Sequence, residues 1–528
     1  MQSVYDSASF LDAQAMANGL PSDILMENAA SHLEWAVLNS VQKMLHDNPF
    51  WVSIAKKNFV SVLIFCGSGN NGADGYTLAR RLQQKTIQIV KDQTLILKPI
   101  IYFTKNPKTE QCVEQAKRAT QFGCTKISFF EDSTQEIPSS TLKENALFCP
   151  VIVDCLIGTG FEGILDSKTQ TVLNFLNDIR QEQDYTTFIS CDIPTGLTTK
   201  GLCATHPFCA DITITMGCYK TALFSDAAKN FVGEIQIAEL GISQNLFENP
   251  PKLQEPELSS NKKLFLLEQT DMKLPFRTQQ NCHKGLFGHA VFFAGEKLGA
   301  CIFASTACFT LGCGLVSVVC KDDKQCFFPP EIMIAKEIPQ KTSALCIGMG
   351  TGHENPLFAD FFDYAYEHTE IPCILDADSF YQKEFANFIE KRGNCVITPH
   401  PKEFAQILKT CNIGDFSIAE IVEQRLEICS AFCKKYSNVV LILKGANSLI
   451  CYKDSIWINN FGTNVLARGG SGDTIAGLIT SLLSQGYNLV EAAKNASLIH
   501  TIAAKNVGKA NYAVRQEDIL SEIARGLL

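Results

Sequence analysis

The stretch ARGGSGDTIAG, residues 467–477, combines glycines with one carboxylate. Gly469, Gly470 and Gly472 are typical of a loop that brings backbone N–H groups to an anion, and the apolar run after them is typical of a helix. A helix N-terminus favours a phosphate, which Asp473 would repel. The carboxylate has a use if it takes the proton of a hydroxyl that attacks a phosphoryl group. The motif therefore predicts phosphoryl transfer with Asp473 as the base, and a structural place in the first helical turn is the alternative.

Further polar residues in the second half of the chain come directly after apolar runs. They are Asp376, Asp378, His400, Glu403 and Lys444. Ligands of open α/β sheets bind beyond the carboxyl ends of the strands, so we expect these side chains to surround one site. A single histidine such as His400 is more often structural than functional. Several polar residues in this arrangement favour a binding site.

The first half contains another glycine-rich turn, SVLIFCGSGNNGADG, at residues 61–75. Its Gly-x-Gly-x-x-Gly spacing alone is a weak dinucleotide signal. The segment from Asn70 to Asp74 crowds amides and a carboxylate onto one turn, although Asn and Gly also form turns that have no function. Asp154 and Thr195 follow apolar runs in the same way. Together with Asn71 they could supply oxygen ligands to a hard monovalent or divalent cation.

Short apolar runs alternate with helical stretches in both halves. This rhythm predicts an α/β fold of βαβ units with largely parallel sheets. Residues 243–275 are instead rich in proline, serine and mixed charge, so we place a domain join near 245–260 and expect domains at 1–245 and 246–528. The expected strands are SVLIF, LILKPIIYF, PVIVD, TTFISCD, DITITM and EIQIAEL in the first domain, and HAVFFAG, LVSVV, LCIG, CILDAD, CVITPH and VVLILKG in the second.

Composition narrows the class of protein. At 528 residues the chain is too long for one ordinary core, and 46% hydrophobic with 19% charged residues fits a soluble globular protein. The net charge of −9 and the lack of a Lys/Arg-dense run argue against a nucleic-acid surface. The 22 cysteines form no C-x-x-C pair, and no histidine has zinc-ligand spacing, so we interpret them as buried thiols in a reducing cytosol.

The sequence also argues against a membrane location. Acidic residues among the first thirty do not fit a signal peptide. Residues 300–320 carry no charge and are long enough to cross a bilayer, but the Gly-Cys-Gly at 312–314 divides them into an expected helix and strand. We therefore expect a cytoplasmic protein with no membrane contact.

The motifs of the second half occur in an order that resembles the ribokinase-like NAD(P)H-hydrate dehydratases. The order is K-G-x-F-G-H, G-A-C, G-x-G-x-G, L-D-A-D, T-P-H-P-x-E, L-K-G and G-G-S-G-D. The resemblance implies a ribokinase-like αβα domain that uses ADP or ATP with Mg²⁺ to phosphorylate the hydroxyl of S-NAD(P)H hydrate and eliminate phosphate. Met349 and Ser448 stand where the family usually has Pro and Thr, which leaves the nucleotide preference open. The resemblance implies hydrate contacts at Ala300, Gly350, Gly352, His400 and Asp473, and nucleotide contacts at Lys444, Gly445, Ala446, Asn447, Ser448 and Gly472.

The first half, with LMENAA at 25–30 and TMGCYK at 215–220, resembles the NAD(P)H-hydrate epimerase domain. The resemblance implies a Rossmann-like αβα domain that interconverts the R and S hydrates, with Asp192 as acid/base residue and less weight on Lys220. Ala73 and Thr195 stand where the family usually has Gly and Ser, and Ala73 weakens binding if its position needs a positive φ. The implied hydrate contacts are Asn70, Asn71, Gly72, Ala73, Asp74, Gly158, Thr159, Gly160, Phe161, Glu162, Gly163, Ile164 and Asp192, and the implied K⁺ ligands are Asn71, Asp154 and Thr195.

One chain with both domains resembles the bifunctional NAD(P)H-hydrate repair enzymes. Its expected partners are small molecules, namely the NADH and NADPH hydrates and an adenine nucleotide, rather than nucleic acid or membrane. The alternative is a ribokinase-like vitamin or sugar kinase with an N-terminal binding module, since Lys-Gly and Gly-Ser-Gly-Asp turns suit phosphoryl transfer to any hydroxyl. The sequence leaves the oligomeric state open, a homo-oligomer included.

Overall fold

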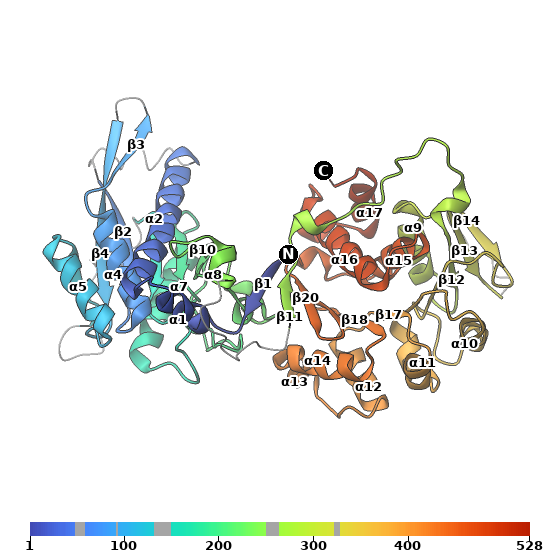
Figure 1. Ribbon diagram of the computed structural model, residues 1–528. Coiled ribbons are helices and arrows are strands. Elements are labelled where there is room, and N and C mark those ends of the chain that lie inside the picture. The colour runs from blue at the N-terminus through green and yellow to red at the C-terminus, as the bar shows by residue number, and fades with distance from the viewer. Residues whose placement is uncertain (48–58, 91–92, 131–148, 250–262, 322–327, 528) are drawn as a thin grey trace. The chain divides into compact units, whose positions relative to one another are not determined.

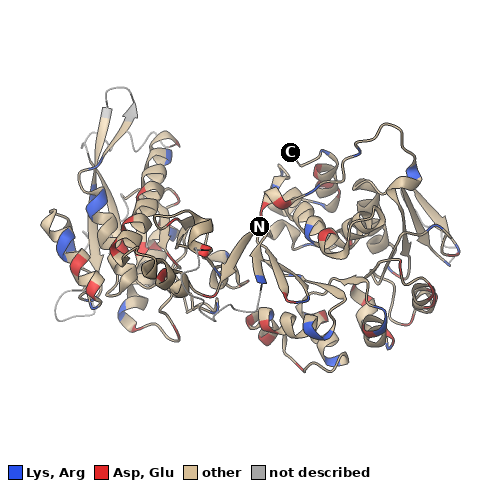
Figure 2. Ribbon diagram, in the orientation of Figure 1, with Lys and Arg blue, Asp and Glu red and all other residues tan. Residues whose placement is uncertain are grey.

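The computed structural model describes residues 1–47, 59–90, 93–130, 149–249, 263–321 and 328–527 (Figure 1). The chain divides into two compact units: Val4–Leu258, and Met1–Ser3 together with Ser259–Leu528. Each unit is a sheet covered by helices. Lys and Arg are interspersed with Asp and Glu over both units (Figure 2). No helix in the described ranges is both long and apolar enough to cross a membrane.

The first unit contains a mostly parallel sheet in the order β10-β8-β7-β6-β2-β4-β3, with β5 beside β4. Among the described strands of this sheet, β3 and β4 form an antiparallel pair and the other pairs are parallel. All six runs expected in this half are confirmed as strands. The strands are β2 (Phe59–Cys66), β3 (Thr86–Val90), β4 (Gln93–Phe103), β5 (Thr125–Ser128), β6 (Val151–Cys155), β7 (Thr187–Cys191), β8 (Ile212–Met216) and β10 (Glu234–Ala238), with the short β9 (Tyr219–Lys220) outside the sheet.

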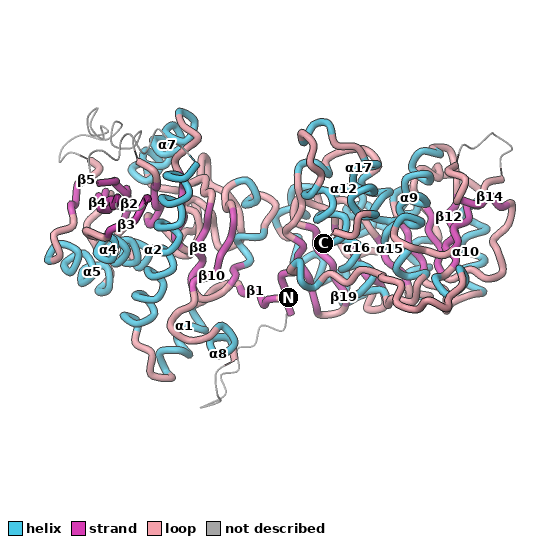
Figure 3. The backbone as a smooth tube through the Cα atoms, turned by 90° about the horizontal axis from the view of Figure 1, so that it is seen from above, coloured by secondary structure: helices cyan, strands magenta, loops and turns pink. Residues whose placement is uncertain are grey.

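Helices cover both faces of this sheet, and in Figure 3 its strands lie between α7 on one side and α2, α4 and α5 on the other. Successive residues of a strand point to opposite faces, so Val62 and Ile64 pack with α2 and α4, whereas Leu63 and Phe65 pack with α7. Burial on both faces explains the continuous apolar runs. The helices are α1 (Ser9–Ala17), α2 (Ser22–Asp47), α4 (Asn70–Leu82), α5 (Glu110–Gln121), α7 (Ser167–Glu182) and α8 (Gln244–Glu248).

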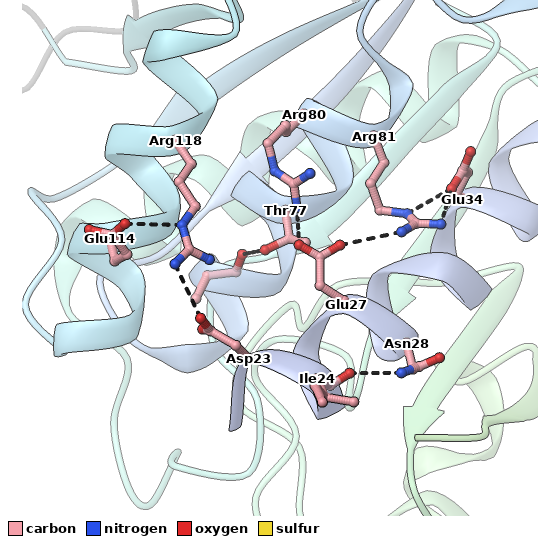
Figure 4. Close-up of polar contacts among 11 residues, drawn as sticks. Asp23, Ile24, Glu27, Asn28, Glu34, Thr77, Arg80, Arg81, Glu114 and Arg118 are labelled. Carbon is pink, nitrogen blue, oxygen red and sulfur yellow. Dashed lines mark hydrogen bonds and ion pairs between the residues drawn. The ribbon is translucent and has the colours of Figure 1, made fainter. Parts of the chain in front are cut away.

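Ion pairs fix α4, which begins at the predicted site, against its neighbours (Figure 4). Arg80 and Arg81 of α4 bind Glu27 of α2, and Arg81 Nε also donates to Glu34 Oε2 at 2.7 Å. Glu34 is 5% exposed, and Lys85 is its second partner. A buried carboxylate that lost these cations would be left uncompensated, so the pairs hold the C-terminal half of α4 in place.

The second unit has a sheet in the order β14-β13-β12-β15-β16-β17-β18-β19-β20-β11. β14 to β18 run parallel, β18, β19 and β20 form antiparallel pairs, and Gln2 and Ser3 of β1 (Gln2–Tyr5) pair with β11. All six expected runs are again confirmed. The strands are β11 (Lys263–Leu266), β12 (His289–Phe293), β13 (Leu315–Val319), β14 (Ile332–Ala335), β15 (Ala344–Ile347), β16 (Cys373–Leu375), β17 (Cys395–Ile397), β18 (Val439–Leu443), β19 (Ser448–Tyr452) and β20 (Ser455–Asn459).

Two cores fill the space between this sheet and its helices. Small and aliphatic residues pack α9, α15, α16 and α17 against one face. On the other face, aromatic pairs such as Phe293–Phe361, with ring centroids 5.6 Å apart, pack α10. Helix α9 followed by β13 confirms the helix and strand expected in the uncharged segment 300–320. The helices are α9 (Leu298–Thr310), α10 (Leu357–Glu367), α11 (Phe385–Lys391), α12 (Pro401–Thr410), α13 (Ile418–Glu423), α14 (Arg425–Lys435), α15 (Ser471–Ser484), α16 (Leu489–Asn506) and α17 (Gln516–Ala524).

Candidate active sites

The candidate site of the first unit lies at the carboxyl ends of β2, β6 and β7. A Cβ atom placed on Gly158 would lie 3.2 Å from Asp192 Oδ2 and 3.3 Å from Asn71 Oδ1. Residues from three separate predicted segments therefore meet at one loop. Both polar atoms of the Asn71 side chain are buried, and no group in the described part of the chain bonds to them. Buried polar atoms are normally satisfied, so this amide points to a ligand or ion.

Asp192 is held in an unusual conformation. Its φ of +69° lies in the left-handed region, where non-glycine residues are uncommon and cluster at functional sites. Its Oδ1 accepts hydrogen bonds from Lys220 Nζ at 2.6 Å and from the backbone N–H of Met216 at 3.2 Å. The Asp192 side chain is 13% exposed, so its carboxylate lies in a recess with one oxygen committed to the protein.

Asp154 and Thr195 form the second part of the predicted cation site. Asp154 accepts from the backbone N–H of Thr195 at 2.8 Å, from its hydroxyl at 2.7 Å and from the N–H of Leu156 at 3.1 Å. Burial raises the pKa of Asp154 to about 6 despite these bonds. A carboxylate, a hydroxyl and the unsatisfied amide oxygen of Asn71 are the hard oxygen donors that an alkali cation takes. The residues thus fit the predicted ion.

Two further carboxyl groups belong to this site. Burial and then the charge of Asp192 raise the pKa of Asp74 well above its usual range. Burial also raises the pKa of Asp12 to about 6, with Lys220 lowering it and Asp192 raising it. Sequence reasoning named Asp74 but missed Asp12, which lies in α1. No motif marks Asp12, because only the tertiary fold brings α1 to the site.

The other predicted hydrate contacts differ in where they lie. Ala73 is buried in α4 with an ordinary negative φ, so the conformational strain considered for an alanine there does not arise. Phe161 is 6% exposed and packs in the core on the α7 side of the sheet, whereas Ile164 is 98% exposed. Thr159 is half-buried. The remaining predicted residues split between buried Gly72 and exposed Asn70, Gly160, Glu162 and Gly163.

The candidate site of the second unit lies at the carboxyl ends of β15 to β18. Lys444, directly after β18, donates to Asp376 Oδ1 at 3.1 Å, and its Nζ lies 3.9 Å from Glu403 Oε2. Asp376 is 2% exposed. A Cβ atom on Gly472 would lie 3.4 Å from Lys444 Nζ and 3.9 Å from Asp376 Oδ2. The start of α15 therefore lies against the lysine, as its predicted role at a nucleotide requires.

The N-terminus of α15 is open to an anion. The N-cap is Gly470, which has a φ of +89° and no side chain, and no side chain caps the helix. The N–H of Ser471 donates to the carbonyl of Arg468 at 3.3 Å, whereas the N–H groups of Gly472 and Asp473 have no acceptor among the described residues, as at an anion site. Asp473 lies in this first turn, and no group of the described chain bonds to its carboxylate. Burial, and then the charge of Asp376, raise the pKa of Asp473 to about 6. These features favour the base over a capping role.

His400 has a structural role as the N-cap of α12. Its Nδ1 accepts from the backbone N–H of Glu403 at 3.2 Å, and Glu403 Oε2 accepts from the N–H of His400 at 2.8 Å. An accepting Nδ1 leaves the proton of a neutral ring on Nε2. Burial and then Lys444 lower the pKa of His400, so the neutral ring dominates at pH 7. Its predicted contact with a hydrate stays a prediction.

The glycine turn after β15 meets the start of α9. A Cβ atom on Gly350, whose φ is +61°, would lie 2.6 Å from Lys297 Cβ and 3.3 Å from Ala300 Cβ. Only glycine leaves this approach open, so the structure brings Gly350 and Ala300 together. The N–H of Gly352 donates to Asp378 Oδ2 at 2.8 Å. Sequence reasoning missed Lys297, for which the adjoining G-A-C motif is the nearest signal.

The segment after Lys444 joins β18 to β19 in an antiparallel pair. Gly445 and Ala446 are exposed, Asn447 is fully buried and Ser448 begins β19. This turn lies next to Lys444, as expected if its backbone contacts a nucleotide. The nucleotide contacts themselves stay predictions.

The folds and sites define a class of protein: an enzyme of two α/β units, each with its own polar site at the carboxyl ends of parallel strands. A family model described as YjeF-related protein N-terminus matches residues 22–222, and one described as NAD(P)H-hydrate dehydratase matches residues 291–525. The chain is 38% identical to a bifunctional NAD(P)H-hydrate repair enzyme of Helicobacter pylori over 99% of both proteins. The chain therefore belongs to the family of bifunctional NAD(P)H-hydrate repair enzymes.

Two further similarities were found. The chain is 27% identical to a protein of the same name from Moorella thermoacetica, over 93% of this chain and 89% of that protein. Among solved structures, an ADP/ATP-dependent NAD(P)H-hydrate dehydratase of Bacillus subtilis crystallised with ATP and Mg²⁺ has a TM-score of 0.41 and 22% identity. That likeness covers 51% of this chain and 98% of the other.

Proposed function

We propose that the first unit interconverts the R and S hydrates of NADH and NADPH, and that the second unit dehydrates the S form with ADP or ATP and Mg²⁺. The observation that carries the second activity is the uncapped start of α15 with Asp473 in its first turn, beside Lys444. An anion site and a free carboxylate in one helical turn suit a phosphoryl donor and a hydroxyl acceptor.

In the dehydratase, Asp473 takes the proton of the hydrate hydroxyl as the hydroxyl oxygen attacks the terminal phosphoryl group. The bridging P–O bond breaks, and the shortened nucleotide leaves with its electron pair. With its pKa raised to about 6, Asp473 is largely ionised at pH 7 yet basic enough to accept a proton. The N–H groups at the start of α15 and Lys444 bind the phosphoryl oxygens. The C–O bond of the phosphorylated hydrate then breaks, phosphate leaves with that electron pair, and the ring nitrogen supplies the pair that restores the dihydronicotinamide after loss of a proton.

In the epimerase, the carbon that is inverted bears both the hydroxyl and the ring nitrogen. Asp192 takes the hydroxyl proton while the bond from this carbon to the nitrogen breaks, so that a carbonyl forms and the electron pair moves onto the nitrogen. Closure on the opposite face returns the proton to the hydroxyl. Asn71, Asp154 and Thr195 would hold K⁺, which would supply positive charge beside this site.

The many buried thiols suit the reducing cytoplasm, which we propose as the location.

The test is a mixture of R and S NADPH hydrates supplied with ADP or ATP, Mg²⁺ and K⁺, followed by recovery of dihydronicotinamide absorbance. Complete recovery, faster than the hydrates interconvert spontaneously, is the expected result. Recovery of the S fraction alone would reduce the first unit to a binding module. A stable phosphorylated product without orthophosphate would overturn the dehydratase in favour of a small-molecule kinase.

A further inference from the structure

Lys220 is buried and all of its donors are committed. It is 1% exposed, and its Nζ donates to Asp192 Oδ1 at 2.6 Å, to Thr215 Oγ1 at 2.9 Å and to the carbonyl of Met216 at 2.9 Å. An ammonium group has three donors, so none is left for a ligand. Burial of a lysine is costly, which makes its place beside a recessed carboxylate informative.

The backbone of Lys220 is fixed as firmly as its side chain. Lys220 lies in β9 and pairs with Tyr5 of β1. The acceptors of its ammonium group come from β8 and from the residue after β7. The lysine thus links three elements around Asp192. It does not face the Asn71 and Gly158 side of the carboxylate, where the other oxygen points.

The two oxygens of Asp192 have different surroundings. Oδ1 accepts from Lys220 and from the N–H of Met216, whereas Oδ2 lies toward the Gly158 loop and the amide of Asn71. This is the loop at which the proposed function places the hydrate. Only Oδ2 can therefore reach a hydroxyl group there, because Oδ1 is already occupied on the far side.

We infer that Lys220 is a positioning residue of the epimerase: it anchors Asp192 through Oδ1 so that Oδ2 exchanges the proton of the hydrate hydroxyl. This inference rests on the proposed epimerase function. Without Lys220, the N–H of Met216 would be the remaining anchor of Asp192 Oδ1, and the carboxylate could turn away from the hydrate.

The test uses the full chain with Lys220→Met and the matched control Lys200→Met, whose lysine is exposed in the same unit. Conversion of R to S hydrate is followed by NMR without nucleotide, and dehydration of S hydrate in the same preparation reports on the second unit. We expect kcat for epimerisation to fall about 100-fold in Lys220→Met, with KM and dehydration little changed. Lys200→Met should match the wild type. Epimerisation by Lys220→Met at a near wild-type rate would overturn the inference.

Two further variants guard against a simple loss of folding. Ethylammonium added to Lys220→Ala should restore part of kcat, because it returns a cation to the vacated space, whereas tetramethylammonium, which has no N–H donor, should not. Thr215→Val removes one acceptor of Lys220 without changing the volume, so we expect kcat for epimerisation to fall by a smaller factor than in Lys220→Met, with KM little changed. If Thr215→Val leaves kcat unchanged, and ethylammonium has no effect, Lys220 has no positioning role. A wild type that does not epimerise would refute the proposed function instead.

Discussion

Each site contains a candidate base and a lysine, but the hydrogen bonds of the lysine differ between the two sites. In the first unit Lys220 bonds directly to the candidate base, at 2.6 Å from Asp192 Oδ1. In the second, Lys444 bonds at 3.1 Å to Asp376, a neighbour of the candidate base, and no group of the described chain bonds to Asp473. One base is anchored, whereas the other is free in the first turn of a helix.

The difference follows from what each lysine has to do. Lys220 is 1% exposed, and all three N–H donors of its ammonium group bond to acceptors within the protein. The side chain of Lys444 is 23% exposed, and its Nζ donates to Asp376 at 3.1 Å and lies 3.9 Å from Glu403 Oε2, which leaves it accessible to the phosphate oxygens proposed as its ligands. The hydrogen bond to Asp376 holds Lys444 close to Gly472. A lysine shared with a ligand cannot also anchor the base.

The largest expected effect is the loss of one activity while the other stays at the wild-type rate. Asp473→Asn removes the base and should lower the dehydration rate by about 10³-fold or more, while R to S conversion stays at the wild-type rate. Asp192→Asn should give the reverse pattern. Both rates are measured on one preparation, by absorbance recovery and by NMR. Dehydration by Asp473→Asn at a near wild-type rate would show that the base is another group.

Lys444→Met tests the contact between Lys444 and Asp376 in the second site. Loss of its charge leaves Asp376 buried without a partner and takes a cation from the phosphoryl site, so we expect kcat/KM for the nucleotide to fall about 100-fold. Lys409→Met is the matched control, since the ion-pair partner of Lys409 among the described residues is the exposed Asp415. Steady-state rates at varied ADP and ATP measure the effect. A change in kcat/KM no larger than that of the control would remove Lys444 from the nucleotide site.

The strands around both sites could be predicted from the sequence, because strands buried on both faces are written as continuous apolar runs that end in Gly, Asp, His or Lys. β1 and β11 were not predicted, since strands of four residues carry little local pattern and these two pair across about 260 residues of sequence. For the same reason Asp12 and the bonds of Lys220 were missed. Contacts that only the tertiary fold creates have no signature in a single sequence.

The pH dependence of dehydration should follow the free base of the second site. Burial and Asp376 raise the pKa of Asp473 to about 6, and only the ionised carboxylate can take a proton. The rate should therefore be constant above about pH 7 and fall roughly tenfold for each pH unit below 6. Rates of S-hydrate dehydration at saturating nucleotide from pH 5 to 8 measure the profile. An acid limb centred near pH 4 would contradict a raised pKa.

The smallest expected effect is the pH dependence of the free energy of unfolding that comes from Asp473. Asp473 has a pKa of about 6 in the folded chain against 3.8 for a free side chain, so the folded state binds more protons between these values. Stability from this group is therefore present below about pH 4 and is lost as the pH rises through 6. The shift corresponds to at most about 3 kcal/mol, at about 1.4 kcal/mol per unit.

Asp473→Asn cannot ionise, so the inactive variant should be the more stable protein at pH 8. We expect a higher unfolding temperature for the second unit by calorimetry at pH 8, and no difference from the wild type at pH 4. Asp415→Asn, at an exposed carboxylate of the same unit, is the control and should show neither change. An Asp473→Asn protein less stable than the wild type at pH 8 would mean that the folded chain stabilises the charged carboxylate. The second site would then hold its base as firmly as the first, and the contrast between them would disappear.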